Sequence, residues 1–196
     1  MPVDAKLVAT LREMTGAGMM DAKRALEESN GDLTAAAEQL RVKGIAKAAS
    51  KSERVTKEGK VHAYIHGTGK LGAMVEVLCE TDFVARTEGF LDLCQDLAMH
   101  VSATDPIYVK REDVPADLVE KQKEIFRAEL AEQAKPAEIV EKIVEGKLAK
   151  YFSEICLLEQ AFIKDEDVTV DEFIKAKVAT IGENIQVARF SRFQIS

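Results

Sequence analysis

Cysteine is scarce in this sequence, and its spacing excludes two kinds of stabilising site. The three cysteines, Cys79, Cys94 and Cys156, are odd in number and far apart. No Cys-x-x-Cys pair and no Cys/His spacing typical of a zinc site is present. We therefore expect neither a disulfide framework nor a bound metal, and we predict buried free thiols in a reducing compartment.

Long apolar runs are missing as well. No segment approaches the ~18 consecutive apolar residues of a membrane-spanning helix. The first residues, Met1-Pro2-Val3-Asp4, lack the basic and then apolar pattern of a signal peptide. We expect a cytoplasmic protein that does not bind a membrane.

Net positive charge is also lacking, although basic residues gather in one stretch. The chain has 27 basic and 34 acidic residues, and its net charge of −7 is unfavourable for general binding to nucleic acid. Between residues 41 and 57, a single acidic residue, Glu53, accompanies six basic ones: Arg41, Lys43, Lys47, Lys51, Arg54 and Lys57. This run favours a solvated connector, and a ribosome- or RNA-associated binding module is the alternative.

The first 45 residues predict three short helices. The first helix carries four apolar residues at helical spacing: Val3, Leu7, Leu11 and Met14. The glycine-containing run at residues 15–18 ends it, and a second helix is expected from about Met19 to Ser29.

The third helix begins after a turn signal at Asn30-Gly31. Asp32 is a favourable N-cap, and Gly44 fits the position that follows the end of a helix. We place a basic connector, helical or flexible, at residues 46–58.

A change of hydrophobic period marks a second region, residues 59–196. From Lys60 to Cys79, apolar residues alternate with others on both sides of a glycine-containing segment at 67–70, which predicts a β-hairpin. A helix with an apolar stripe from Phe90 to Val101 follows. Residues 107–109 predict a short strand or a connector.

Two further helices are separated by a very short link at Ala134-Lys135. They are expected at residues 116–133 and from Pro136 onward, and they predict a projecting antiparallel helical hairpin over about residues 116–150. Helix is expected to continue over residues 147–155.

The remainder predicts an extended segment at residues 157–163, a helix that ends at Gly182, and a terminal strand at about residues 185–195. Strands and helices are mixed without a βαβ rhythm. The sequence therefore predicts an α+β fold with an antiparallel-sheet core and packed helices.

The segment Gly67–Gly72 matches the pattern GxGxxG of dinucleotide-binding loops. In such a loop a helix must follow, so that its N-terminus meets the phosphate. A β pattern follows here, and the P-loop pattern fails because Tyr64 and Leu71 stand at its required Gly and Ser/Thr positions. We interpret the segment as a hairpin turn and predict no cofactor.

Two histidines share one face of the first strand. His62 and His66 could begin a metal site with Glu76 or Glu80, but no third ligand is fixed by the spacing, which favours solvent-face or interface histidines. Glu80 and Asp82 could form a carboxylate pair for acid–base catalysis. No nucleophile, metal motif or convergent histidine accompanies them, so the sequence favours a protein without catalytic residues over an enzyme.

Two apolar segments have two interpretations each. Met19 and Met20 are either core filler or an adaptable contact, and one of two adjacent residues must point away from the buried stripe of a helix. The segment Thr81-Asp82-Phe83-Val84 lies between a strand and a helix, where loops can be exposed. Its spacing favours Phe83 as a core anchor, with a surface position as the alternative.

Several segments of this chain occur in an order known from one protein family. The most specific are Thr15-Gly16-Ala17-Gly18-Met19-Met20-Asp21 and Thr81-Asp82-Phe83-Val84-Ala85-Arg86. The others are Lys23–Leu26, Asn30–Asp32, Ala98–His100, Lys135–Gly146 and Ile181–Ile185. Together they resemble the elongation factor Ts family.

The resemblance implies a guanine nucleotide exchange factor for elongation factor Tu in translation elongation, without covalent chemistry of its own. Such a factor promotes GDP release by binding the GTPase domain and disturbing its Mg²⁺ and phosphate site. It also implies that residues 1–45 form a module similar to a ubiquitin-associated domain. Arg12, Met19 and Met20 match residues that the family uses to dock this module on the GTPase domain.

The resemblance further implies that Thr81–Val84 dislocates the partner's Mg²⁺, with Asp82 and Phe83 intruding between helices of the partner. His66 resembles a histidine that approaches the partner's phosphate loop. Long members of the family hold two related sheet units in tandem, whereas this chain has one. It is similar to the short members, which pair two subunits, so a homodimer that binds two copies of elongation factor Tu is expected.

Overall fold

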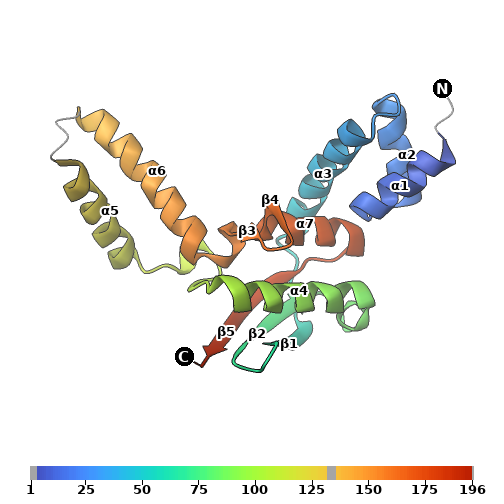
Figure 1. The fold of residues 1–196 in the computed structure, drawn as a ribbon. Helices are drawn as coiled ribbons and strands as arrows, with labels where there is room; N and C mark the ends of the chain where they lie inside the picture. Colours follow the sequence, from blue (N-terminus) through green and yellow to red (C-terminus); the bar gives the residue numbers. More distant parts are fainter. Residues whose placement is uncertain (1–3, 132–135, 196) are drawn as a thin grey trace. The chain divides into compact units, whose positions relative to one another are not determined.

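The structure, a computed structural model, describes residues 4–131 and 136–195. Over these ranges the chain has an α+β fold, in which seven α-helices accompany one three-stranded antiparallel sheet and one two-stranded sheet (Figure 1). The predicted fold class is confirmed. The chain divides into two compact units, each made of separate stretches of sequence. The first unit comprises Met1–Val61, Val77–Cys94 and Glu172–Gln186, and the second comprises His62–Glu76, Gln95–Asp171 and Val187–Ser196.

Three helices, α1 (Ala5–Thr15), α2 (Met19–Glu28) and α3 (Leu33–Ala49), begin the first unit. The carboxylates of Asp4 and Asp32 cap α1 and α3 by accepting hydrogen bonds from N–H groups of the first turn, and Gly16, with φ of 66°, ends α1. The helices share one apolar cluster: Val8, Leu11, Ala22, Ala25, Leu26 and Ala36. The three-helix prediction is confirmed, while Val3 lies outside the described residues.

The predicted end of the third helix at Gly44 is wrong. Helix α3 continues past Gly44 to Ala49, into the range expected for the connector. Gly44 is buried beside Ala179 of α7 (Val170–Ile181), and a Cβ added to it would lie 3.4 Å from the Ala179 Cβ. Glycine at this position therefore permits close helix packing rather than a left-handed helix end. Met14 is exposed, because Val8 and Leu11 face the other two helices.

The main sheet contains β1 (Glu58–His66), β2 (Leu71–Cys79) and β5 (Gln186–Gln194) in the order β1-β2-β5, so β2 is central. In the turn between β1 and β2, Gly69 N donates to His66 O at 2.9 Å, and Gly67 and Gly69 have positive φ angles. The predicted hairpin and terminal strand are confirmed. Because a strand follows the glycines, the segment lacks the helix that a dinucleotide-binding loop requires.

Helix α4 (Glu88–Thr104) lies over one face of this sheet (Figure 1). His62 Nε2 of β1 lies 2.7 Å from Gln95 Oε1, and Arg192 Nε of β5 donates to Ser102 O at 2.8 Å. The predicted apolar stripe of this helix has no exposed surface: Phe90, Leu93, Cys94, Leu97 and Val101. The helix prediction is confirmed.

Helices α5 (Ala116–Ala131) and α6 (Ala137–Ile155) pack side by side as a hairpin in the second unit (Figure 1). A two-pronged ion pair joins them, because Arg127 Nε and Nη2 donate to the carboxylate of Glu141 at 2.8 and 2.9 Å. The hairpin prediction is confirmed, and its expected link at Ala134-Lys135 lies outside the described residues. Nowhere in the described ranges is a helix long and apolar enough to cross a membrane.

The segment at residues 157–163 differs from the expected extended chain. It begins with a 3-10 turn, η3 (Leu157–Glu159), and β3 (Ala161–Phe162) then pairs with an unpredicted strand, β4 (Asp165–Thr169). Charged residues at 164–167 hide the alternation of this small hairpin in the sequence. Residues 107–109 form a connector, in which Tyr108 makes a single parallel bridge to Cys156.

Candidate functional site

The loop Thr81–Val84 follows β2 and leads into a 3-10 turn, η1 (Val84–Arg86), in the first unit. The Phe83 side chain is 80% exposed. Asp82 lies beside it, and its carboxylate accepts a hydrogen bond from Arg86 Nη2 at 2.8 Å. The interpretation of Phe83 as a core anchor is wrong, because Ala85 is the buried residue of this turn. The loop presents an aromatic ring and a carboxylate to solvent.

The backbone that carries this ring is fixed on both sides. Thr81 O accepts from Ala85 N at 3.3 Å, and Phe83 O accepts from Arg86 N at 3.2 Å. Thr81 Oγ1 also donates to Glu183 Oε1 at 2.6 Å. The exposed Phe83 ring is therefore attached to an ordered turn rather than to a loose segment.

A second apolar surface lies at the turn between α1 and α2. Met19 and Met20 are 61% and 67% exposed, so both methionines point to solvent and neither is core filler. Arg12 Nε donates to Ala17 O at 3.2 Å, which ties the exposed arginine to this turn. The structure thus places the three predicted docking residues of the helical module around one turn.

The two strand histidines have different surroundings. His66 is exposed, and its Nδ1 atom lies 2.8 Å from Tyr64 Oη. His62 is half-buried and is hydrogen-bonded to Gln95 of α4. His66 belongs to the second unit, whereas Thr81–Val84 belongs to the first. Within residues 4–131 and 136–195, no group of three His, Cys, Asp or Glu residues has an arrangement that could hold a metal ion.

The carboxylates considered for acid–base catalysis have separate partners. Glu80 Oε1 accepts from Asn184 N at 2.6 Å, while Asp82 pairs with Arg86. Each carboxylate is therefore engaged in holding its own part of the chain. This arrangement supports a structural or partner-contact role for Glu80 and Asp82.

The basic run at residues 41–57 is largely matched by acidic residues of the same unit. The ion pairs are Arg41 with Glu38 and Glu172, Lys43 with Glu28, Lys47 with Asp21, and Arg54 with Glu80. Lys51 Nζ donates to Gly182 O at 2.6 Å. These pairs are exposed and individually weak, but together they reduce the positive potential that an RNA backbone would require.

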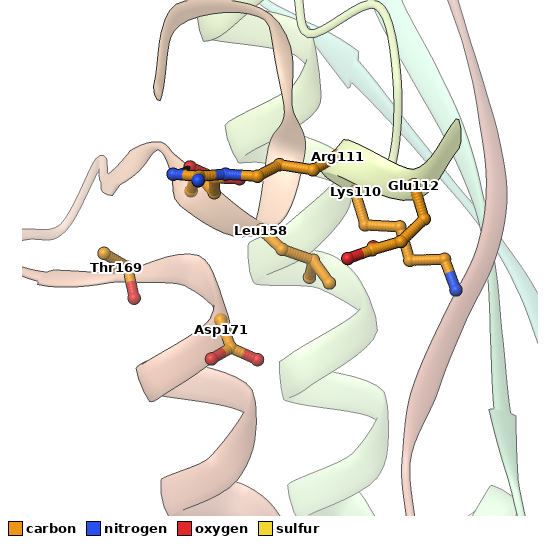
Figure 2. Close-up of a pocket in the computed structure, with 7 residues that line it drawn as sticks. Lys110, Arg111, Glu112, Leu158, Thr169 and Asp171 are labelled. Carbon is orange, nitrogen blue, oxygen red and sulfur yellow. Dashed lines mark hydrogen bonds and ion pairs between the residues drawn. The ribbon is translucent and has the colours of Figure 1, made fainter. Parts of the chain in front are cut away.

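An open cavity of about 250 Å³ lies in the second unit. Figure 2 shows the residues that line it: Lys110, Arg111, Glu112, Leu158, Glu159, Thr169 and Asp171. Arg111 is paired with Glu159, which raises the pKa of this guanidinium, and it also lies 4.8 Å from the centre of the Phe152 ring. With charges of both signs and one apolar residue, the cavity has no concentrated feature that selects a ligand.

Comparisons with known proteins give a consistent result. A family profile described as "Elongation factor TS" matches residues 5–196. Elongation factor Ts of Carboxydothermus hydrogenoformans is 54% identical over 193 residues, which cover 98% of this chain and 89% of that protein. Elongation factor Ts of Fervidobacterium nodosum is 54% identical over 195 residues, which cover 100% of this chain and 99% of that protein.

Proposed function

The chain belongs to the elongation factor Ts family of translation elongation factors, and from this premise we propose that it is the guanine nucleotide exchange factor of elongation factor Tu. In this proposal the chain binds the GTPase domain of its partner and promotes GDP release. It does so by disturbing the partner's Mg²⁺ and phosphate site, and it makes or breaks no covalent bond. The observation that carries the proposal is the exposed pair Asp82 and Phe83 on an ordered turn.

The physical basis of exchange is reciprocal coupling. If the factor binds the empty GTPase better than the GDP-bound GTPase, GDP must weaken binding of the factor by the same ratio that the factor weakens binding of GDP. A ratio of ~100 requires ~2.7 kcal/mol of coupling free energy. The factor needs contacts of that strength which form only with the nucleotide-free partner.

Phe83 can supply much of this coupling. Its side chain is 80% exposed in the free chain, so its apolar surface remains available for burial in a partner. Full burial of such a side chain stabilises a complex by about 1.5–3 kcal/mol. If the apolar gap that receives the ring opens only in the nucleotide-free partner, this free energy favours that state.

Asp82 supplies the electrostatic part of the proposal. A bound Mg²⁺ is the largest local positive charge that opposes the phosphates, so loss of the metal weakens nucleotide binding. The Asp82 carboxylate is exposed and paired only with Arg86 of its own turn among the ion pairs described, a pair that is weak in solvent. It is therefore available to compete for polar groups around the partner's metal.

In the proposal, the helical module contributes to binding of the partner but not to the displacement of GDP. Met19, Met20 and Arg12 surround one turn, and methionine side chains adapt well to an apolar partner surface. In the proposal they dock the factor on the GTPase domain, while His66, exposed at the end of β1, approaches the phosphate loop. We propose no role for nucleic acid, because the basic run is matched by acidic residues, and we expect a cytoplasmic location.

We also propose that two chains pair through the sheet face opposite α4. A Cβ added to Gly72 would lie 2.6 Å from Ile65 Cδ1, so Ile65 covers Gly72 on that face. Met74 shares the face because side chains alternate along a strand. Glu76, the next residue on the same face, pairs with Arg189 of β5, and Phe193 is on the same side as Arg189.

Beside the Glu76–Arg189 ion pair, this face carries several exposed apolar side chains. Ile65, Met74 and Phe193 are 65%, 44% and 66% exposed, and Ile195 extends the row. An exposed apolar patch on one face of a sheet is typical of a protein–protein interface. Two such faces packed against each other would form a closed dimer in which the same residues contribute from both chains.

The test of the proposed function is release of a fluorescent GDP from elongation factor Tu. The chain is added at a concentration well below that of the GTPase, with excess unlabelled GDP present. Accelerated release of all the bound fluorophore is expected, since an exchange factor turns over. An unchanged release rate with folded chain would contradict the proposal and leave only a binding module.

A further inference from the structure

Two carboxylates link the end of β2 to the segment after α7. Each accepts hydrogen bonds from groups in the segment that carries the other. Glu183 Oε2 accepts from the backbone N atoms of Glu80 and Thr81, each at 3.0 Å, and Glu183 Oε1 accepts from Thr81 Oγ1 at 2.6 Å. In return, Glu80 Oε1 accepts from Asn184 N at 2.6 Å. We refer to Glu80 and Glu183 as the carboxylate clamp.

The segment that carries Glu183 is itself held in place. Asn184 is 4% exposed, and its Nδ2 atom donates to Ser52 O at 3.2 Å and to Arg54 O at 2.8 Å. Lys51 Nζ donates to Gly182 O at 2.6 Å. Displacement of this segment would leave buried polar groups without partners, which is unfavourable. The clamp is thus built on a fixed support within the first unit.

The exposed loop depends on this support because its one large aromatic side chain does not pack against the chain, and the buried residue of the turn is the small Ala85. Phe83 is 80% exposed and cannot anchor its own backbone in the free chain. Glu183 makes three hydrogen bonds to Glu80 and Thr81, the two residues that precede Asp82. Hydrogen bonds to a carboxylate are stronger than neutral ones, so they are suited to fixing an exposed turn.

We propose that Glu183 is a positioning residue for nucleotide exchange. It holds the loop Thr81–Val84 in the conformation that presents Asp82 and Phe83, so that little ordering remains to be done when the partner binds. This inference rests on the proposed function, and it adds a residue that contributes through the loop. Its support is the clamp geometry together with the exposure of Phe83.

Three variants test the inference. Glu183→Gln removes the negative charge; its remaining oxygen can still accept from the two backbone N–H groups and its NH₂ group can donate to the Thr81 hydroxyl, so the three contacts are weakened from charge-assisted to neutral hydrogen bonds. Glu183→Asp keeps both oxygens on a side chain shorter by one methylene. Glu38→Gln is the matched control, because it removes an exposed carboxylate of the same unit that pairs with Arg41.

The first measurement is amide hydrogen exchange of the free chain, which does not depend on the partner. In Glu183→Gln the amides of Glu80 and Thr81 are expected to exchange faster than in the wild type, while those of β2 keep their protection. Glu38→Gln is expected to match the wild type. Unchanged protection at residues 80 and 81 in Glu183→Gln would overturn the inference.

The second measurement is the rate of GDP release from elongation factor Tu per unit concentration of the factor. Glu183→Gln is expected to lower it about tenfold, equivalent to about 1.4 kcal/mol, and Glu183→Asp to lower it less. In a Phe83→Ala background the same Glu183→Gln change is expected to have a clearly smaller effect, since Glu183 then positions only Asp82. A tenfold loss in both backgrounds would show a general structural role and overturn the inference.

The two proposals fail in distinguishable ways. If the folded wild type does not accelerate GDP release, the proposed function is wrong, and the exchange role of Glu183 falls with it. If the wild type accelerates release and Glu183→Gln does so equally well, only the positioning role is wrong.

Discussion

His100 Nε2 lies 3.0 Å from Gln160 Oε1, in a place where the histidine side chain has no exposed surface. Its other ring nitrogen, Nδ1, accepts a hydrogen bond from Ile163 N at 3.2 Å. These partners require a neutral ring with its proton on Nε2. The histidine therefore ties α4 to the chain at residues 160–163, and protonation of Nδ1 would place a second donor against the Ile163 N–H.

The first prediction concerns the pH dependence of stability. Burial holds the pKa of His100 below its ordinary value of 6.5, and the hydrogen bond with Gln160 opposes this only in part. Below pH 6.5 the unfolded chain therefore binds more protons at this site than the folded chain, until the pH reaches the folded-state pKa. The free energy of unfolding should fall through this window, by at most about 1.4 kcal/mol per pH unit from this group.

The measurement is urea unfolding of the wild type and of His100→Gln between about pH 7.5 and about pH 5.5. The wild type should be the more stable at the higher pH, because the substitution disturbs buried hydrogen bonds. The difference between the two free energies of unfolding should narrow as the pH falls, since only the wild type has a titrating side chain at residue 100. Parallel curves would contradict the prediction.

The second prediction is that the cysteines react slowly in the folded chain. All three thiols are buried, and burial raises the pKa of Cys94 to about 12 and that of Cys156 to about 11, with Cys79 shifted in the same direction. At about pH 8 the reactive thiolate is then roughly 10⁻³ or less of Cys94 and Cys156. Maleimide labelling should be at least ~100-fold slower in buffer than in concentrated urea. Rapid labelling of the native chain would show that a thiol is accessible.

Local signals in the sequence predicted much of the fold. Asp32 caps α3 through its own side chain, and the alternation around Gly67 and Gly69 requires only neighbouring residues to form a hairpin. Such features depend on the chain within a few residues, so period and turn chemistry identify them. Gly44 escaped prediction because its role depends on Ala179, a residue distant in sequence.

The candidate site was predicted less completely for the same reason. The segment around Phe83 was identified from the family resemblance, but spacing alone favoured a buried ring, since an aromatic residue at a strand end fits either environment. Glu183 lies in the segment Ile181–Ile185, which contributes to the family resemblance, but the sequence assigns it no role. Its contact with Glu80 joins residues 103 positions apart, and no periodicity connects them.

The third prediction is that Phe83→Ala impairs exchange without unfolding the chain. Because the ring is 80% exposed, the free energy of unfolding should change by less than about 0.5 kcal/mol. The efficiency of GDP release should fall by up to ~100-fold, if most of the coupling comes from burial of this ring. Urea unfolding and GDP release measured on the same preparation separate the two effects.

Ile107→Ala is the control for this substitution. Ile107 is 63% exposed and lies in a connector outside the proposed contact residues, so its removal should leave both measurements unchanged. Equal losses of stability and exchange in Phe83→Ala would show that the ring supports the fold instead of the partner contact.

The fourth prediction concerns the sheet face that carries Ile65, Met74 and Phe193. The wild type should sediment with twice the 21.6 kDa chain mass. Met74→Glu places a charge on the central strand, and in a closed dimer the same charge appears on both chains within one apolar interface. A buried, unpaired carboxylate is strongly unfavourable, so the variant should sediment with the mass of a single chain.

Val42→Glu distinguishes this effect from a general effect of added charge. Val42 is 55% exposed on α3 and is not one of the residues of the proposed face, so the same substitution there should leave the dimer intact. Sedimentation equilibrium of the three proteins at one concentration provides the comparison. A wild type that sediments as a single chain would refute the dimer, whereas a Met74→Glu variant that remains dimeric would assign pairing to another surface.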